Sequence, residues 1–224
     1  MVDLYTINGQ SSGKIEKIFS ITELKDIENK LLLYKNKVKS DYTKKNTFTG
    51  IDSKNPLYSW FIKKIFNKIK DFTDYDLKLL FGAILESKKP IAIHSDWYNK
   101  KDGGDLFMNF LIPLSLDLNK EVNDTFTIIF NEIIVEQENE NQKGNEPIWN
   151  NYKKLENNAT NYIQTLLSHI EHEKLEKLSI QNILQWTIGD VLFWDSRLMH
   201  CSNDFISNGN FVKHGIVIQT YVDK

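Results

Sequence analysis

The feature that most constrains the fold is a series of short aromatic and β-branched runs in the middle of the chain. These runs cover residues 75–87, 89–96, 106–116 and 124–135, and turn-rich breaks such as KKDGGD and NKEVND separate them. Runs of this length and composition are typical of β-strands. Three more follow near the C-terminus, as ILQW, DVLFW and FVKHGIVIQTYV. The sequence therefore predicts that most of the chain after residue 75 forms sheet.

Helices are predicted on either side of the first strands. Residues 21–36 and 56–69 carry apolar side chains at three-to-four spacing, and the second segment opens with Pro56 at a first helical turn. Residues 136–146 (EQENENQKGNE) predict a solvated loop, and an apolar stripe over residues 155–170 predicts a helix after it. This order favours a mostly β, α+β fold whose core is a two-sheet jelly roll with helices packed outside.

The length of 224 residues predicts one domain, because single barrels and sandwiches of about 200–250 residues are common. Within residues 1–224 we expect three parts. Residues 1–70 form a helical N-terminal elaboration, residues 76–135 and 180–224 form the jelly-roll core, and residues 136–178 form a loop-and-helix insert.

Charge and cysteine content narrow the partners and the compartment. The 28 basic and 30 acidic residues are mixed along the chain, which leaves no basic stripe for nucleic acid. A single cysteine, Cys201, excludes an intramolecular disulfide framework and fits a reducing compartment. We find no apolar signal core and no run of about 20 apolar residues, so we expect a cytoplasmic protein without a membrane partner.

Three residues have the chemistry of metal ligands. In KPIAIHSDWYN, His94 and Asp96 follow a strand-like run, and residues two apart on an extended chain project to the same side. A third ligand, His200, stands in IGDVLFWDSRLMHCSN, just beyond the strand predicted for residues 191–194. Two histidines and one carboxylate can form a facial triad that leaves one face of an Fe(II) ion open.

The order of these motifs resembles that of the Fe(II)- and 2-oxoglutarate-dependent oxygenases, especially their phytanoyl-CoA dioxygenase-like branch. The resemblance spans about residues 76–222 and is carried by HSD at 94–96, NFLIPLSL, GDVLFWDSRLMHCS and KHGIVIQT. It implies a double-stranded β-helix, the cupin-like form of the jelly roll. It also implies that His94, Asp96 and His200 are the catalytic residues that hold iron, and that 2-oxoglutarate and O₂ are co-substrates.

The activity implied by this resemblance is hydroxylation of a substrate, expected to be a small molecule, with release of succinate and CO₂. Halogenating relatives have a small residue in place of the carboxylate, so Asp96 favours hydroxylation over halogenation. The alternative is a jelly-roll module that binds a metal or another ligand without catalysis. The two differ in whether an oxo acid binds at the metal.

The resemblance requires a basic residue on the last strand for the far carboxylate of 2-oxoglutarate. Lys213 and His214 compete for this role, and strand alternation places them on opposite faces. We assign Lys213, because its face is more polar and includes the small Gly215, as a ligand-lined interior requires. The family more often has Arg there, frequently with Ser or Thr two residues later. Asn109, expected near the metal end of the sheet, is assigned to co-substrate contact.

Other candidate sites are weaker. His169, His172 and Glu173 have spacings that bring ligands together on a helix, but His172 falls nearly opposite the apolar stripe, which favours a solvated face over a zinc site. Cys201 is adjacent to His200, and adjacent strand residues face opposite ways, which favours a small buried thiol over a nucleophile.

Asp195 and Arg197 lie between the strand predicted for residues 191–194 and His200. They either orient His200 or the substrate, or form an ordinary surface pair.

Overall fold

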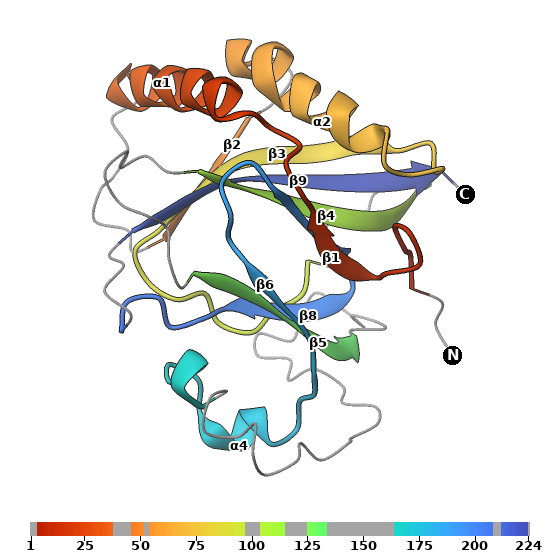
Figure 1. Ribbon diagram of the computed structural model, residues 1–224, viewed down its shortest axis with the longest axis vertical. Helices are drawn as coiled ribbons and strands as arrows, with labels where there is room; N and C mark the ends of the chain where they lie inside the picture. Colours follow the sequence, from red (N-terminus) through yellow and green to blue (C-terminus); the bar gives the residue numbers. More distant parts are fainter. Residues whose placement is uncertain are drawn as a thin grey trace, which may run out of the picture.

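Two antiparallel sheets face each other in the computed structural model, which describes residues 4–37, 46–51, 54–96, 104–114, 125–133, 164–207 and 212–223 (Figure 1). The larger sheet has six strands in the order β1-β7-β4-β9-β3-β2, and the smaller has three in the order β6-β5-β8. The two layers form the mostly β core with flanking helices that the sequence predicts.

The strands of the larger sheet are β1 (Ser12–Ile15), β2 (Asn46–Gly50), β3 (Lys78–Ser87), β4 (Gly104–Leu114), β7 (Val191–Asp195) and β9 (Lys213–Asp223). Those of the smaller sheet are β5 (Phe126–Ile133), β6 (Ile180–Gln185) and β8 (Leu198–Ser202). The helices are α1 (Ile21–Lys37), α2 (Lys63–Lys70), which continues a π-helical turn η1 (Tyr58–Ile62), and the short α4 (His172–Leu175).

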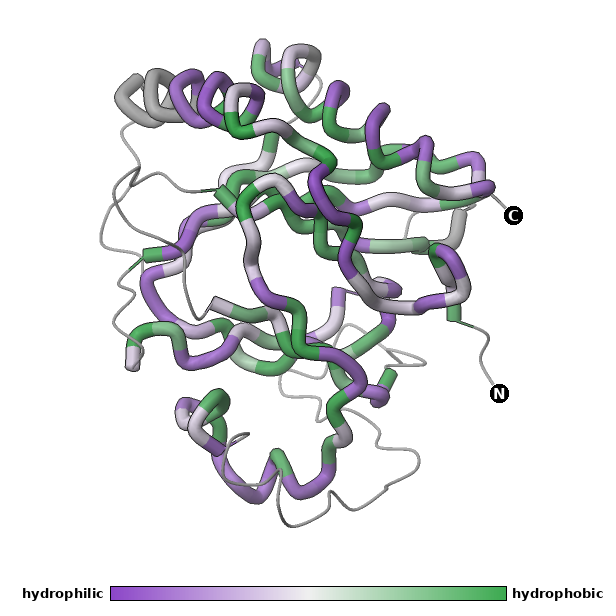
Figure 2. Tube along the Cα trace, in the orientation of Figure 1, coloured by the Kyte–Doolittle hydropathy of each residue, from purple (hydrophilic) through white to green (hydrophobic). Residues whose placement is uncertain are grey.

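Both predicted N-terminal helices are confirmed, and they cover the outer face of the larger sheet (Figure 1). A capping box starts α1: the Ser20 hydroxyl accepts from the Glu23 N–H, and the Glu23 carboxylate accepts from the Ser20 N–H. In Figure 2 the turns of α2 that face the sheet are hydrophobic and those that face away are hydrophilic. Ile65 and Ile69 of α2 are fully buried, which anchors this helix on the sheet.

Strand β9 separates the two cores of the molecule. Ile216 and Ile218 belong to the outer core beneath the helices, together with Ile65 and Ile69 of α2. Val217 belongs to the inner core between the sheets, together with residues of β3, β4 and β7. The predicted alternation of an apolar outer face and a mixed inner face along this strand is confirmed.

The structure differs from the sequence prediction in two segments. The segment 1–70, predicted as a helical elaboration, also supplies both edge strands of the larger sheet: β1 pairs with β7 and β2 pairs with β3. The run 89–96, predicted as a strand, is extended chain with one isolated bridge at His94. Pro90 contributes to this difference, because it has no N–H to donate to a ladder.

The later strands agree with the sequence except at His200, which was expected just beyond the sheet and lies inside β8. The loop predicted for 136–146 lies outside the described residues, as does the helix predicted for 155–170 up to residue 163; residues 164–166 are helical. Among the described helices, none is long and apolar enough to cross a bilayer.

Candidate metal centre

His94 and His200 are brought together by two backbone hydrogen bonds. The His94 N–H donates to the His200 carbonyl at 3.0 Å, and the His200 N–H donates to the His94 carbonyl at 2.8 Å. This isolated bridge fixes the two residues directly opposite each other, and their ring centroids are 4.3 Å apart. This backbone pairing, which joins two segments far apart in the sequence, sets the spacing of the two imidazoles.

Each imidazole has its Nδ1 atom on a main-chain carbonyl. His94 Nδ1 is 2.8 Å from the Ala92 oxygen, and His200 Nδ1 is 3.1 Å from the Leu198 oxygen. A carbonyl only accepts, so Nδ1 carries the proton and Nε2 keeps its lone pair. Burial lowers the pKa of His200 well below its ordinary value, and the nearby His94 lowers it further. The His200 ring thus presents Nε2 in the neutral form that binds a metal.

Asp96 completes the cluster. The ligand atoms of His94, Asp96 and His200 all lie within 4.8 Å of one another, and Asp96 Oδ2 is 3.3 Å from His200 Nε2. Within the described residues this is the one such group of three. The pKa of Asp96 is raised, because the effect of burial outweighs the opposing effect of the nearby His94. Two imidazole nitrogens and one carboxylate are the donor set of a facial-triad iron site, so these residues fit Fe(II).

Asn109 donates a hydrogen bond to Asp96, at the same carboxylate oxygen that lies near His200. Its Nδ2 atom donates to Asp96 Oδ2 at 2.5 Å, its Oδ1 atom accepts from the Ser196 hydroxyl at 3.4 Å, and the side chain is fully buried. Asn109 is absent from the residues that line the cavity described below. The assignment of Asn109 to co-substrate contact stays a prediction; in the structure its amide contacts Asp96.

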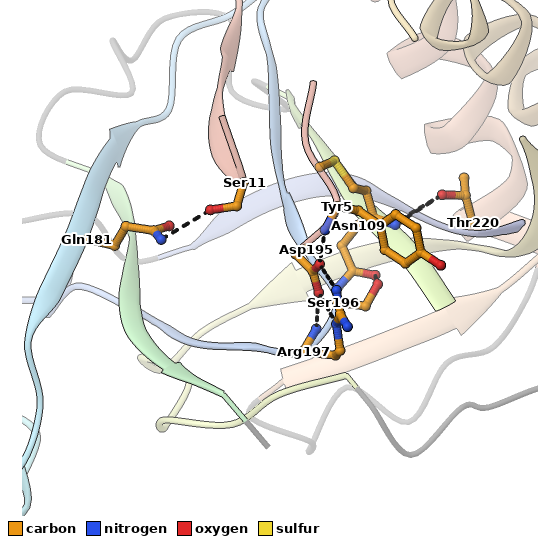
Figure 3. A network of polar contacts seen from close by, with 9 residues as sticks. Tyr5, Ser11, Asn109, Gln181, Asp195, Ser196, Arg197 and Thr220 are labelled. Atoms are coloured by element: carbon orange, nitrogen blue, oxygen red, sulfur yellow. Dashed lines mark hydrogen bonds and ion pairs between the residues drawn. The ribbon is translucent and has the colours of Figure 1, made fainter. Parts of the chain in front are cut away.

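The chain crosses from β7 to β8 at Asp195, Ser196 and Arg197 (Figure 3). The Ser196 carbonyl accepts from the Asp96 N–H at 3.2 Å, and the Ser196 N–H donates to the Phe107 carbonyl at 3.2 Å. The register of β4 shifts between Leu106 and Asn109, so a β-bulge precedes Asn109. The bulge and the crossover together set the position of Asp96.

Asp195 and Arg197 form a buried ion pair, with the Asp195 side chain fully buried and that of Arg197 11% exposed. The Asp195 carboxylate also accepts from the Tyr5 N–H at 2.8 Å (Figure 3). The alternative of an ordinary surface pair is therefore wrong. This pair ties the N-terminal segment to the crossover that leads to His200.

A cavity of about 500 Å³ opens at the triad between the two sheets. Its described walls are mostly aromatic and aliphatic, with a few polar groups. Besides the triad they comprise Phe81, Leu85, Ile91, Leu111, Thr127, Trp186, Trp194, Cys201, Ser202, Lys213, Val217 and Gln219. A concave apolar site with few convergent polar groups is typical of small-molecule binding.

Lys213 lines this cavity, and His214 does not. The Lys213 ammonium lies 4.4 Å from the centroid of the Trp186 ring and 5.0 Å from that of Phe205. Within the part of the chain that the structure describes, no carboxylate forms an ion pair with it, and burial lowers the pKa of Lys213 to about 7. His214 contacts Glu86 at 3.2 Å. Of the two competing residues, Lys213 is therefore the one with access to a ligand.

Two hydroxyls that the sequence analysis missed lie at the lysine side of the cavity. Thr127 and Ser202 are register partners on β5 and β8. The Thr127 hydroxyl accepts from Trp186 Nε1 at 2.9 Å, and the Ser202 hydroxyl accepts from the Ile91 N–H at 2.7 Å. Each hydroxyl therefore has its own proton to donate. Ser202 stands two residues after His200, the one sequence signal that could have indicated it.

Of the rival residues, His172 and Cys201 behave as expected. His172 is exposed on α4 and contacts Glu176 at 3.2 Å, in keeping with a solvated face. Cys201 packs with Met199 and Ile128 in a third apolar cluster, and burial raises the pKa of its thiol. Neither residue joins the triad.

No protein-family model matches the sequence, and no curated protein matches it. The fold is similar to that of the non-heme alpha-ketoglutarate-dependent carbocyclase SnoK from nogalamycin biosynthesis, at 13% identity and a TM-score of 0.58, over 96% of this chain and 81% of that one. The fold of this chain is thus a double-stranded β-helix. At this identity the similarity concerns the fold.

Two further solved structures share this double-stranded β-helix. The epimerase SnoN, in complex with Fe³⁺, alpha ketoglutarate and nogalamycin RO, matches at 14% identity and a TM-score of 0.56, over 95% of this chain and 79% of that one. HygX from Streptomyces hygroscopicus, with nickel, 2-oxoglutarate and hygromycin B bound, matches at 15% identity and a TM-score of 0.52, over 97% and 85%.

Proposed function

We propose that this protein is an Fe(II)- and 2-oxoglutarate-dependent oxygenase of the phytanoyl-CoA dioxygenase-like branch that hydroxylates a small molecule and releases succinate and CO₂. The observation that carries the proposal is the His94, Asp96 and His200 cluster, whose ligand atoms lie within 4.8 Å of one another at the wall of a cavity that also contains Lys213. Solved structures with the same fold contain a metal and 2-oxoglutarate, which supports this choice among jelly-roll functions.

The triad residues would hold the metal through His94 Nε2, His200 Nε2 and an Asp96 carboxylate oxygen. When bound, Fe(II) with 2-oxoglutarate and O₂ supplies the oxidising power to convert a C–H bond to a C–OH bond. Three protein ligands leave the remaining positions to small molecules. The Asn109 amide donates to the Asp96 carboxylate and would hold this carboxylate in one orientation for metal binding.

Lys213, Thr127 and Ser202 would hold the far carboxylate of the oxo acid. Ser202 follows His200 by two residues on one face of β8, which places it about 7 Å further along the strand. This separation suits a short dicarboxylate that reaches from the metal to the lysine. Two hydroxyl donors also supply the directed hydrogen bonds that a lysine point charge lacks relative to an arginine fork. The Trp186 ring beside Lys213 would exclude water and so strengthen the ion pair between Lys213 and this carboxylate.

The direct test is succinate formation from 2-oxoglutarate in the presence of Fe(II) and O₂, measured by mass spectrometry. We expect wild-type protein to form succinate slowly even without substrate, and Asp96→Ala to form none. Lys213→Ala should raise the concentration of 2-oxoglutarate needed for half-maximal rate. His172→Ala, which changes an exposed histidine, is the control for His200→Ala. Metal binding without succinate formation in wild type would favour a non-catalytic binding module.

A further inference from the structure

Phe81 on β3 is an exposed aromatic ring in the wall of the cavity. It keeps 39% of its surface exposed, and among the exposed large hydrophobic residues of the described chain it is the one that lines this cavity. An aromatic ring of this kind offers a large apolar contact surface to a ligand.

The register of the larger sheet places Phe81 in line with Asn109, with β9 between them. Phe81 pairs with Gln219 of β9, and Gln219 pairs with Asn109, whose amide holds Asp96. Lys213 stands six positions before Gln219 on the same strand, and it also lines the cavity. The cavity therefore extends from the triad in two directions, toward Lys213 with its two hydroxyls and toward Phe81 with Gln219.

Strand β2 supports the ring of Phe81. A Cβ atom at Gly50 would come within 3.0 Å of Phe81 Cε2, so the ring packs on the bare backbone at this glycine. A ring that is backed by the neighbouring strand presents a fixed, flat surface to the cavity. Such a surface loses little conformational freedom when a planar ligand stacks on it.

The charges around the cavity favour an uncharged ligand at Phe81. Its ionisable lining residues, within the described chain, are the three triad residues, Lys213 and Cys201. The triad is committed to the metal, Lys213 to the oxo acid, and Cys201 is a neutral thiol. Among the described lining residues, a charged ligand at Phe81 would find no uncommitted partner for its charge, which favours a neutral ligand.

We propose that Phe81 and Gln219 form the substrate subsite and that it takes a neutral small molecule with a flat apolar surface, such as an aromatic or fused-ring compound. The reading of this subsite as a substrate site depends on the proposed oxygenase function, because the oxo acid must occupy the lysine side. The specificity then comes from the ring of Phe81.

The test is binding of the neutral fluorescent probe N-phenyl-1-naphthylamine to protein with and without Ni(II) and 2-oxoglutarate. We expect Phe81→Ala to weaken this binding about tenfold, as loss of a stacking partner does. Phe72→Ala is the matched control, since Phe72 is 37% exposed and does not line the cavity; we expect a change below about twofold. Dansylcadaverine, whose amine is protonated, should bind more weakly than the neutral probe.

Equal binding of the neutral probe by wild type and Phe81→Ala would overturn the proposal, as would tighter binding of dansylcadaverine. Circular dichroism checks that each variant is folded, and Phe81→Leu replaces Phe81→Ala if the latter unfolds. If the Phe81 effect appears but neither Ni(II) nor 2-oxoglutarate binds, the apolar subsite stands and the oxygenase function fails. If both bind and the Phe81 effect is absent, the oxygenase function stands and this inference fails.

Discussion

Asn109→Ala tests how the triad is held in place. Asn109 Nδ2 lies 2.5 Å from Asp96 Oδ2, and the Asn109 side chain is fully buried. A hydrogen bond to a charged group contributes about 1.5–3 kcal/mol. Loss of an outer partner of a metal ligand weakens metal binding about 10–100-fold, or about 1.4–2.8 kcal/mol. The two energies are of similar size, so we expect Asn109→Ala to lower the Ni(II) affinity about 10–100-fold.

Calorimetric titration with Ni(II) measures this effect, and Asn203→Ala is the matched control. Asn203 is also fully buried, and its Oδ1 atom accepts from the Phe126 N–H at 2.8 Å, away from Asp96. Both variants should lose about 1–3 kcal/mol of unfolding free energy, whereas only Asn109→Ala should lose Ni(II) affinity. Unchanged affinity in Asn109→Ala, or an equal loss in both variants, would refute the reasoning.

Three further predictions concern Lys213 and one turn. Because the pKa of Lys213 is lowered to about 7, 2-oxoglutarate binding to Ni(II)-loaded protein should weaken as pH rises above about 7, and Lys213→Arg should remove this pH dependence in calorimetry. The pKa of Lys213 in the folded protein lies below its ordinary value of 10.5. The buried Lys213 charge therefore lowers the unfolding free energy fully below about pH 7, and this destabilisation disappears as pH rises to 10.5. Lys213→Met should therefore raise the melting temperature at pH 6 much more than at pH 10; an equal increase at both would contradict this linkage. Gly189→Ala should lower the melting temperature more than Gly9→Ala, because both have positive φ but only at Gly189 would a Cβ meet the Phe19 carbonyl, at 2.8 Å; equal losses would contradict this account.

The sequence predicted the parts of this fold that have a strong local pattern. Strand β9 is buried on both faces, and its period-two alternation correctly separated the outer residues Ile216 and Ile218 from the cavity residue Lys213. The three ligand candidates were found because His94 and Asp96 are two residues apart on extended chain, and because His200 follows a recognisable strand. The order of the motifs then predicted that the three residues lie together between two sheets.

The edge strands had no such signal. Strand β1 is the short segment SGKI, and its strand state comes from pairing with β7, which lies far along the chain. Strand β8 was missed because the polar pair Ser196-Arg197 precedes it and its residues LMHCS do not alternate. In both cases tertiary pairing, which single-sequence patterns do not contain, decides the structure.

The role of Asn109 also depends on tertiary structure. Its contact with Asp96 requires a bulge in β4 and the crossover at Ser196, which come from separate parts of the chain. Thr127 and Ser202 likewise become neighbours only through the register of β5 and β8. The sequence could supply residues of suitable chemistry, but the partners of these side chains are set by strand register.

The central claim is that the triad binds iron and that an oxo acid then binds at the iron and at Lys213. Anaerobic titration with Fe(II) followed by 2-oxoglutarate tests it most directly, because the complex has a visible metal-to-ligand charge-transfer band. We expect the band in wild type, its loss in Asp96→Ala and its weakening in Lys213→Ala. Iron binding without a band in wild type, or no iron binding at all, would contradict the claim.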